Sequence, residues 1–442
     1  MRRDTVRIGC GAGFAGDRLE PALLLAEHAG LDYLVLECLG ERTVALAQLR
    51  RRHDPKGGYD PMLERRMAGL LPLIKAKNVT LVTNMGAANP EGAAEATVAI
   101  ARRAGIRLRI AAVTGDDVLA KLDLDDPTIE TGATLRSVGE LVSANAYLGI
   151  EALLPALEGN ADVVITGRVA DPSLFLAPIV HHFGWSPDDH DRLGRGTMVG
   201  HLLECAGQLT GGYYADPGHK NVPGMASLGF PFADVDADGN ARFAKLPGTG
   251  GIITRRTATE QLLYEVTDPS AYKTPDVVAD FSGVILREVG ENVVAASGAC
   301  GKPRPDTLKV SVGYHAGYVG EGEIGYAGEN CVARGKLAGE IVRERLGNQF
   351  RELRIDLTGL TALHSRPMSD GGHHPYEVRL RVAGRAADEE TARRVGEEVE
   401  ALYTNGPAGG GGARKSVYEQ IGIVSCLMPR ERVTPRVAFY EA

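Results

Sequence analysis

The sequence predicts an α/β fold, with a mostly parallel, three-layer (Rossmann-like) N-terminal domain followed by a C-terminal α+β domain of the ferredoxin-like plait type. Five apolar, strand-like runs in the first 171 residues each end in glycine and polar side chains. Segments with helical spacing lie between these runs, which favours crossover connections and parallel strands. The last third of the chain shows the order β-α-β-β-α-β, which is typical of the plait.

The five runs predict five strands whose carboxyl ends share one edge of a sheet. They are VRIGCGAGFAGDR (6–18), DYLVLECLGER (32–42), VTLVTNMGAANP (79–90), LRIAAVTGDD (108–117) and ADVVITGRVAD (161–171). Helical patterns fall at 21–29, 62–74 and 94–101, two of them just before the glycines at 30 and 105. Ligands bind at the carboxyl ends of parallel strands in open sheets and in barrels, so we expect the chemistry there. Five strands leave a partial barrel open as an alternative.

Three more helices complete the first domain, which we place at residues 1–210. The apolar pattern predicts a long helix over 141–157, with Asn145 and Tyr147 near its start. A second helix is predicted at 172–183 and a third at 198–209, separated by a polar stretch.

Two further regions follow along the chain. Residues 211–300 are rich in glycine, proline and short strands, and we expect an irregular β-rich excursion with Asp238 and Gly239 in a hairpin turn and a helix at 259–266. Residues 301–442 form the predicted α+β domain. Its elements are expected at 320–326 (strand), 331–346 (helix), 351–357 (strand), 376–382 (strand), 389–403 (helix) and 420–426 (strand).

Composition excludes several classes of protein. The 442 residues carry a net charge of −8, whereas nucleic-acid binding needs clustered Lys and Arg. No apolar stretch is long enough to span a bilayer, and the N-terminus reaches a glycine-broken strand before an apolar signal region forms. The six cysteines include no CxxC pair, so neither a zinc site nor a disulfide framework is indicated. We therefore expect a cytoplasmic protein.

The first glycine loop is a candidate site for a phosphate or carboxylate. Gly9, Gly11, Gly13 and Gly16 leave a strand and, with Asp17, enter a helix, where backbone N–H groups can hold an anion. The spacing is not GxGxxG, and Glu37 at the end of the second strand is followed by Cys38, so a dinucleotide site is weakly indicated. A tight turn beneath the helix is the alternative.

The segment TGRVAD places a hydroxyl, a guanidinium and a carboxylate in one strand-to-helix turn. Thr166, Arg168 and Asp171 suit the binding of a carboxylate or phosphate, with Arg168 as a bidentate donor and Asp171 acting on substrate or capping the next helix. A buried ion pair between Arg168 and Asp171 is the alternative. Amide donors lie at a neighbouring strand end, on Asn84 and Asn89. Asp116 and Asp117 lie at another strand end, and they are equally suited to binding and to capping a helix.

The segment GHLLEC offers groups for proton transfer. His201, Glu204 and Cys205 lie at i, i+3 and i+4, so they face one side of a helix, and His201 with Glu204 forms a candidate acid/base pair. This is not HExxH and no third ligand has a diagnostic spacing, so we predict no metal site. A divalent ion at Asp17, Asp116 or Asp171 is left open, and no other cofactor is predicted. Cys205 is either a nucleophile or a buried helix cysteine.

A second glycine loop, at 405–416, is a further candidate for anion binding. Gly409, Gly410 and Gly411 precede Arg414 and Lys415, a combination suited to an anion-binding nest. The segment does not match the Walker pattern, and a merely flexible loop is the alternative.

Several strings together resemble the acyclic terpene utilisation (AtuA) family. They are VTNMGAANP, SANAYLGI, VITGRVADPSL, GHLLECAGQLTGG, LGFPFADV, GTGG at 248–251, EQLLYEVTDPSAYKTPDV and NGPAGGGG. The resemblance runs from Arg7 to about Arg430. It implies work near acyl-CoA thioesters, because the family name comes from gene clusters that degrade acyclic terpenes through such intermediates. It supplies no agreed catalytic residues, and it leaves open a small partner subunit.

We therefore expect a lyase or hydratase that acts on a carboxylated or CoA-linked acyl substrate. In this hypothesis Arg168 and Asn84 bind the carboxylate or carbonyl, the loop from Gly11 to Gly16 binds an anion, and His201 with Glu204 moves the proton. One alternative is a non-enzymatic subunit that binds acyl-CoA or scaffolds a carboxylase. The other is an acyl-CoA hydrolase with Cys205 or Ser173 as nucleophile. We expect a homo-oligomer in each case.

Overall fold

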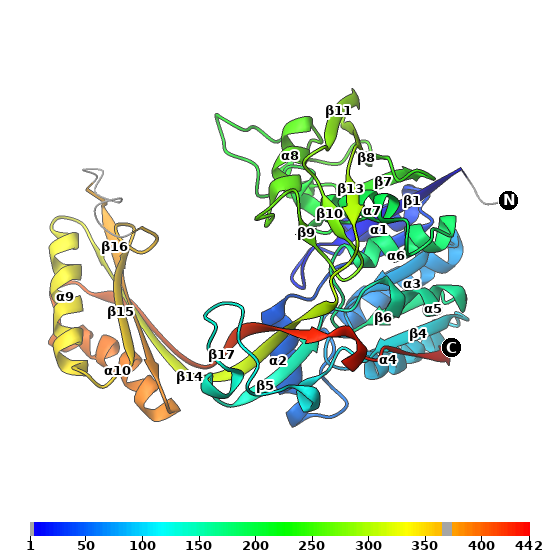
Figure 1. The fold of residues 1–442 in the computed structure, drawn as a ribbon. Helices are drawn as coiled ribbons and strands as arrows, with labels where there is room; N and C mark the ends of the chain where they lie inside the picture. The colour runs from blue at the N-terminus through cyan, green and yellow to red at the C-terminus, as the bar shows by residue number, and fades with distance from the viewer. Residues whose placement is uncertain (1–3, 365–373) are drawn as a thin grey trace. The chain divides into compact units, whose positions relative to one another are not determined.

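The computed structural model describes residues 4–364 and 374–442 and divides into two compact units. The first unit comprises Met1–Gly313 together with Ile423–Ala442, and the second comprises Tyr314–Gly422 (Figure 1). The boundaries predicted at 210 and 300 both fall inside the first unit. The β-rich region at 211–300 therefore belongs to the same compact unit as the N-terminal strands.

The five predicted strands all form, and they pair in parallel in the order β1-β2-β3-β6-β4. Their bounds are β1 Thr5–Ala12, β2 Tyr33–Leu36, β3 Thr80–Thr83, β4 Arg109–Thr114 and β6 Val163–Thr166. Every residue of β2 and β6 is buried, as expected for parallel strands covered on both faces. These five strands place their carboxyl ends on one edge of the sheet.

Antiparallel strands extend this sheet to ten strands, in the order β11-β12-β8-β7-β1-β2-β3-β6-β4-β18. The added strands are β7 Pro231–Asp236, β8 Ala241–Lys245, β11 Ile285–Gly290, β12 Val293–Ser297 and β18 Arg436–Glu441. Asp238 and Gly239 lie in the β7–β8 turn, as predicted, and Gly239 has a positive φ of 84°. Among the described residues β11 and β18 are the two ends of the order, so the sheet does not close into a barrel.

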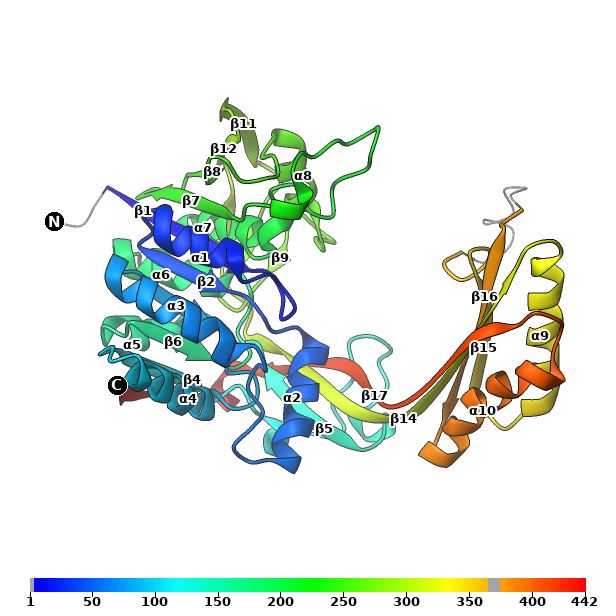
Figure 2. The same cartoon turned by 180° about the vertical axis from the view of Figure 1, so that it is seen from behind.

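Helices cover both faces of the parallel strands. One layer contains α1 Glu20–His28, α3 Leu63–Lys77 and α4 Pro90–Arg103, and the other contains α5 Ile150–Glu158, α6 Ser173–Phe183 and α7 His190–Leu203. Figure 1 faces the second layer and Figure 2 faces the first. The remaining helices of the unit are α2 Glu41–His53 and α8 Arg255–Leu263, and a small sheet contains β9 Tyr272–Lys273, β10 Val278–Asp280 and β13 Cys300–Lys302.

Two predicted helices differ from those observed. The long helix over 141–157 is wrong at its first half, because β5 Leu141–Ala146 is a strand that pairs with β14 Thr307–Ala327, and α5 begins only after Gly149. The helix predicted at 198–209 begins at His190, where Asp189 caps it by accepting a hydrogen bond from Arg192 N, and it ends at Leu203. Cys205 therefore lies beyond the helix that was expected to carry it.

The second unit contains the predicted C-terminal order of strands and helices. The elements are the end of β14, α9 Cys331–Leu346, β15 Glu352–Thr358, β16 Glu377–Ala386, α10 Glu389–Asn405 and the start of β17 Gly411–Pro429. The sheet order is β15-β16-β14-β17, and both helices pack against β16 (Figure 1). Apolar side chains such as Leu380, Val382, Val395 and Val399 form the core between them. Across residues 4–364 and 374–442, no helix combines the length and apolar character needed to cross a bilayer.

Candidate functional site

A cavity of about 620 Å³ lies where β1 and β2 end. Gly13 follows β1 directly and Glu37 follows β2 directly, and both line the cavity. Asp171, after β6, and Glu204, after α7, complete the wall together with Tyr264 and Glu265 from the end of α8. The strand-end edge of the sheet therefore carries the candidate site of the first unit.

The lining of this cavity is acidic, which differs from the anion-recognising surface expected from the sequence. Among the described lining residues, the only Lys or Arg is Arg18. Six residues with carboxyl groups line the cavity: Asp17, Glu37, Glu41, Asp171, Glu204 and Glu265. An acidic lining disfavours an anion unless several of these groups are protonated.

Glu37 is a buried carboxyl held by two donors. Its Oε1 accepts hydrogen bonds from Asn84 Nδ2 at 2.9 Å and from Leu39 N at 2.8 Å. Burial, followed by repulsion from Asp171, raises the pKa of Glu37 to about 8. Asn84 is fully buried, and its Oδ1 accepts a hydrogen bond from Cys38 N at 2.7 Å. Asn84 therefore positions Glu37, and its amide is not free to bind substrate.

Glu204 and His201 form a neutral pair. His201 Nε2 lies 3.2 Å from the Leu262 carbonyl, which can only accept, so this nitrogen carries a hydrogen. Burial lowers the pKa of His201 to about 4, so the imidazole is neutral and Nδ1 has no hydrogen. Nδ1 lies 2.8 Å from Glu204 Oε1 and must accept the hydrogen bond, which requires a protonated Glu204. Burial also raises the pKa of Glu204 well above its usual value.

This geometry changes the role expected for His201. The side chain is 1% exposed and does not line the cavity, whereas Glu204 does. Glu204 Oε2 is buried and has no hydrogen-bond partner among the described residues. His201 therefore positions a protonated Glu204 whose second oxygen has no hydrogen-bond partner among the described residues.

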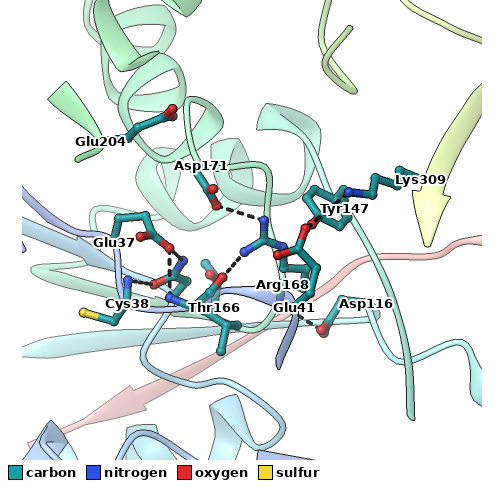
Figure 3. Close-up of polar contacts among 12 residues, drawn as sticks. Glu37, Cys38, Glu41, Asp116, Tyr147, Thr166, Arg168, Asp171, Glu204 and Lys309 are labelled. Carbon is teal, nitrogen blue, oxygen red and sulfur yellow. Dashed lines mark hydrogen bonds and ion pairs between the residues drawn. The ribbon is translucent and has the colours of Figure 1, made fainter. Parts of the chain in front are cut away.

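Arg168 and Asp171 form the buried ion pair that was the alternative interpretation of TGRVAD. Arg168 Nη2 lies 3.1 Å from Asp171 Oδ1, and Arg168 Nη1 donates to the Leu39 carbonyl (Figure 3). The guanidinium carbon lies 4.0 Å from the centre of the Tyr147 ring. Arg168 is 2% exposed and does not line the cavity, so Asp171 is the member of the pair that a ligand can reach.

The pKa of Asp171 is balanced between two opposing effects. Burial raises the pKa of its carboxyl, and the charge and hydrogen bond of Arg168 lower it. Asp171 is therefore a carboxyl group with a fixed counter-ion and a pKa above its usual value.

Glu41 is a carboxyl group of the cavity whose surroundings favour its ionised form, and the sequence reasoning missed it. Tyr147 Oη donates to Glu41 Oε1, and Lys309 Nζ lies 3.2 Å from the same oxygen. Burial raises the pKa of Glu41, but Arg168 and these donors lower it more, to about 2. Glu41 follows Glu37 by four residues after the same strand, which is the signal that could have found it. Lys309 is 268 residues away and gave no local signal.

The other predicted binding groups are used within the protein. Gly13 N donates to Asp17 Oδ2 at 2.9 Å, so the first glycine loop binds its own carboxylate. A Cβ on Gly11 would lie 2.6 Å from Leu36, and one on Gly16 would lie 2.6 Å from Phe14, so both glycines serve packing. Thr166 Oγ1 donates to the Gly167 carbonyl at 2.9 Å. These positions favour the alternative of a tight turn.

Asp116 and Asn89 have structural roles at the same sheet edge. Asp116 Oδ2 accepts hydrogen bonds from Arg168 N and Asn145 Nδ2, both at 2.8 Å, and burial raises the pKa of Asp116 to about 6. Asn89 is the N-cap of α4 and accepts from Gly92 N at 3.0 Å. Both line a separate hollow of about 390 Å³ beside β4, outside the acidic cavity.

The two candidate nucleophiles are poorly placed for attack. Burial raises the pKa of the Cys205 thiol far above its usual value, with a further contribution from Glu204, so the thiolate is disfavoured. Ser173 is fully buried and donates to Asp276 Oδ2 at 2.5 Å. Neither group presents an activated nucleophile to the cavity.

Within residues 4–364 and 374–442, no group of three or more His, Cys, Asp or Glu side chains is arranged to hold a metal ion. In the second unit, Gly411, Arg414 and Lys415 lie in β17 instead of a loop, which corrects the predicted loop at 405–416. Lys415 Nζ pairs with Glu400 at 2.5 Å and Arg414 is exposed. These two cations are not gathered around the glycines.

Comparison with known families identifies the chain. The sequence model of the acyclic terpene utilisation family protein AtuA matches residues 6–439. The chain belongs to the AtuA family. Neither the curated proteins nor the solved structures give a match to this AtuA chain. The match covers both units, including every side chain of the acidic cavity.

Proposed function

We propose that this AtuA family protein is a lyase or hydratase that adds water to, or removes it from, an acyl substrate in the acidic cavity. The observation that carries the proposal is a pair of neighbouring carboxyl groups with different hydrogen-bond and ion-pair partners. Asp171 is paired with the Arg168 guanidinium, whereas Glu37 accepts from an amide and a backbone N–H and has a pKa raised to about 8. A cation in direct contact favours the ionised form of a carboxyl, which suits Asp171 to the role of base and Glu37 to the role of acid.

In the dehydration direction, Asp171 takes a proton from the carbon next to the substrate carbonyl. Glu37 gives its proton to the leaving hydroxyl, the C–O bond breaks, and a C=C bond and water form. Asp171 is then protonated and Glu37 ionised, and a proton transfer from Asp171 to Glu37 restores the starting state. Hydration is the same sequence reversed.

Glu204 and His201 support this chemistry without exchanging the proton themselves. Glu204 Oε2, which has no partner among the described residues, is suited to accept a hydrogen bond from the substrate hydroxyl. Phe14, Met225, Leu228 and Phe230 also line the cavity and offer apolar contact for an acyl chain.

We expect a CoA-linked or free carboxylated acyl group as the substrate, with its negative charge beside Arg18, the one Lys or Arg among the described lining residues. We also infer that the first unit is a Rossmann-like three-layer domain and the second a ferredoxin-like plait, which the strand orders and helix layers support. A cytoplasmic homo-oligomer, with or without a small partner subunit, remains our expectation for the assembly.

The test is turnover of branched 3-hydroxyacyl and 2-enoyl compounds, as CoA esters and as free acids, followed by mass spectrometry and by deuterium uptake from D₂O. Glu37→Gln keeps an oxygen to accept from Asn84 and Leu39 but cannot give a proton, so turnover falls by about 10²–10⁴-fold. Glu27→Gln, on the surface, is the matched control. Wild-type turnover in Glu37→Gln would refute the proposal, and binding of acyl-CoA without turnover by the native chain would favour the accessory-subunit alternative.

A further inference from the structure

The second unit contains a cavity that the proposed chemistry does not use. Its volume is about 500 Å³, and it lies at one end of the four-stranded sheet. The lining comes from the end of β14, the end of β15, the start of β16 and the second glycine loop. The lining residues include Tyr326, Glu377, Arg379, Gly409 and Gly411.

Tyr326, which lines this cavity, has a buried hydroxyl without a partner among the described residues. The side chain is 1% exposed, and its hydroxyl has no hydrogen-bond partner among the described residues. A buried hydroxyl without a hydrogen-bond partner lowers the stability of the folded state, and such groups are rare in native structures. The hydroxyl is therefore suited to a ligand that enters the cavity.

The backbone of the glycine loop passes close to this hydroxyl. A Cβ on Gly410 would lie 3.2 Å from Tyr326 Oη and 3.0 Å from Ile324, so a side chain there would crowd the tyrosine. Gly409 has a positive φ of 75°, which other residues rarely adopt. In the part of the chain that the structure describes, the amides of Gly409 and Gly410 have no backbone acceptor. Backbone N–H groups of this kind bind oxyanions.

A cation without a carboxylate partner lies against the same loop. Arg334, on α9, donates to the carbonyls of Ala408 and Ala327 at 2.7 Å and of Glu329 at 3.0 Å. No carboxylate among the described residues pairs with it, and a Cβ on Gly409 would lie 2.9 Å from its Nη1. Arg379 adds a second positive charge, which Glu323 partly offsets at 3.6 Å.

We propose that this cavity binds the phosphate group of a small molecule. Tyr326 Oη and the amides of Gly409 and Gly410 donate to the phosphate oxygens, and Arg334 and Arg379 supply positive charge. Glu377 also lines the cavity, and its carboxylate can accept a hydrogen bond from a protonated phosphate oxygen. Sulfate at neutral pH carries no such hydrogen, so Glu377 selects phosphate over sulfate.

The experiment is titration of the full-length chain with inorganic phosphate, followed by calorimetry and by ³¹P line broadening, at constant ionic strength. Saturable binding is expected, with sulfate much weaker. Tyr326→Phe keeps the ring in the core and removes only the hydroxyl, so phosphate affinity falls about tenfold. Glu377→Gln reduces the preference for phosphate over sulfate. Tyr376→Phe, exposed and outside the lining, is the control that leaves binding unchanged.

Three outcomes would overturn the proposal: no saturable binding at millimolar phosphate, equal binding of sulfate and phosphate, or unchanged binding in Tyr326→Phe. Because the readout is binding to the second unit, it does not depend on turnover in the acidic cavity.

Discussion

Replacing Arg168 with methionine removes a buried cation that pairs with a carboxyl group of the acidic cavity. The guanidinium is 2% exposed, pairs with Asp171 at 3.1 Å, donates to the Leu39 carbonyl and packs on Tyr147. Methionine fills similar space, so the change leaves little void. Its main consequence is that Asp171 loses its counter-ion.

The size of the destabilisation follows from leaving the Asp171 carboxylate without a counter-ion. Breaking a buried pair by removing one partner typically costs about 3–5 kcal/mol, because the remaining ion is desolvated and unpaired. Arg168→Met should therefore lower the free energy of unfolding by about that amount. Adding Asp171→Asn removes the stranded charge, so the double variant should be more stable than Arg168→Met alone.

Denaturant titration with a fluorescence or far-UV signal from the first unit measures the free energies of unfolding of the single and the double variant. The control is Arg192→Met, because Arg192 pairs with Asp189 and Asp238 at 39% side-chain exposure and should change stability by less than about 1 kcal/mol. A loss below about 1 kcal/mol in Arg168→Met, or a double variant less stable than that single variant, would refute the account of a buried, charge-balancing arginine.

Three further predictions follow from the site. The pKa of Glu37 is raised from 4.5 to about 8, so the stability gained from its protonated form is complete below pH 4.5 and is lost as the pH rises through 8. Between these two pH values the free energy of unfolding should fall by about 1.4 kcal/mol per pH unit. The denaturation midpoint should therefore depend less on pH in Glu37→Gln than in the native chain, and equal slopes would contradict this. Cys205→Ala should retain turnover within about threefold, because the thiol is not the nucleophile; a covalent adduct on Cys205 found by mass spectrometry would contradict it. Gly13→Ala should cost about 1–3 kcal/mol in denaturant titration, because its Cβ would lie 2.5 Å from the Cys205 carbonyl carbon; unchanged stability would show that the loop is not packed against Cys205.

The sequence predicted the elements whose signals are local. Apolar runs that end in glycine and polar residues located all five parallel strands, since such strands are buried on both faces. The spacing of His201 and Glu204 predicted their contact, which is 2.8 Å. The C-terminal strands and helices follow patterns of period two and 3.6 that lie within single segments.

The errors arise where distant contacts decide the outcome. Residues 141–146 read as helix because leucine and alanine continue into the true helix α5, yet pairing with β14 makes them a strand. The same pairing brings Lys309 to Tyr147 and Glu41, which no local pattern encodes. Arg168 was expected to bind an anion because a sequence does not reveal that its charge is already balanced inside the protein.

Protonation of Glu37 is the central claim about the acidic cavity, and difference infrared spectroscopy between the native chain and Glu37→Gln tests it most directly. The account predicts a protonated-carboxyl C=O band from Glu37 at pH 6, which converts to a carboxylate band as the pH rises through about 8. A carboxylate band alone at pH 6 would show that Glu37 is ionised, and it would contradict the assignment of Glu37 as the acid.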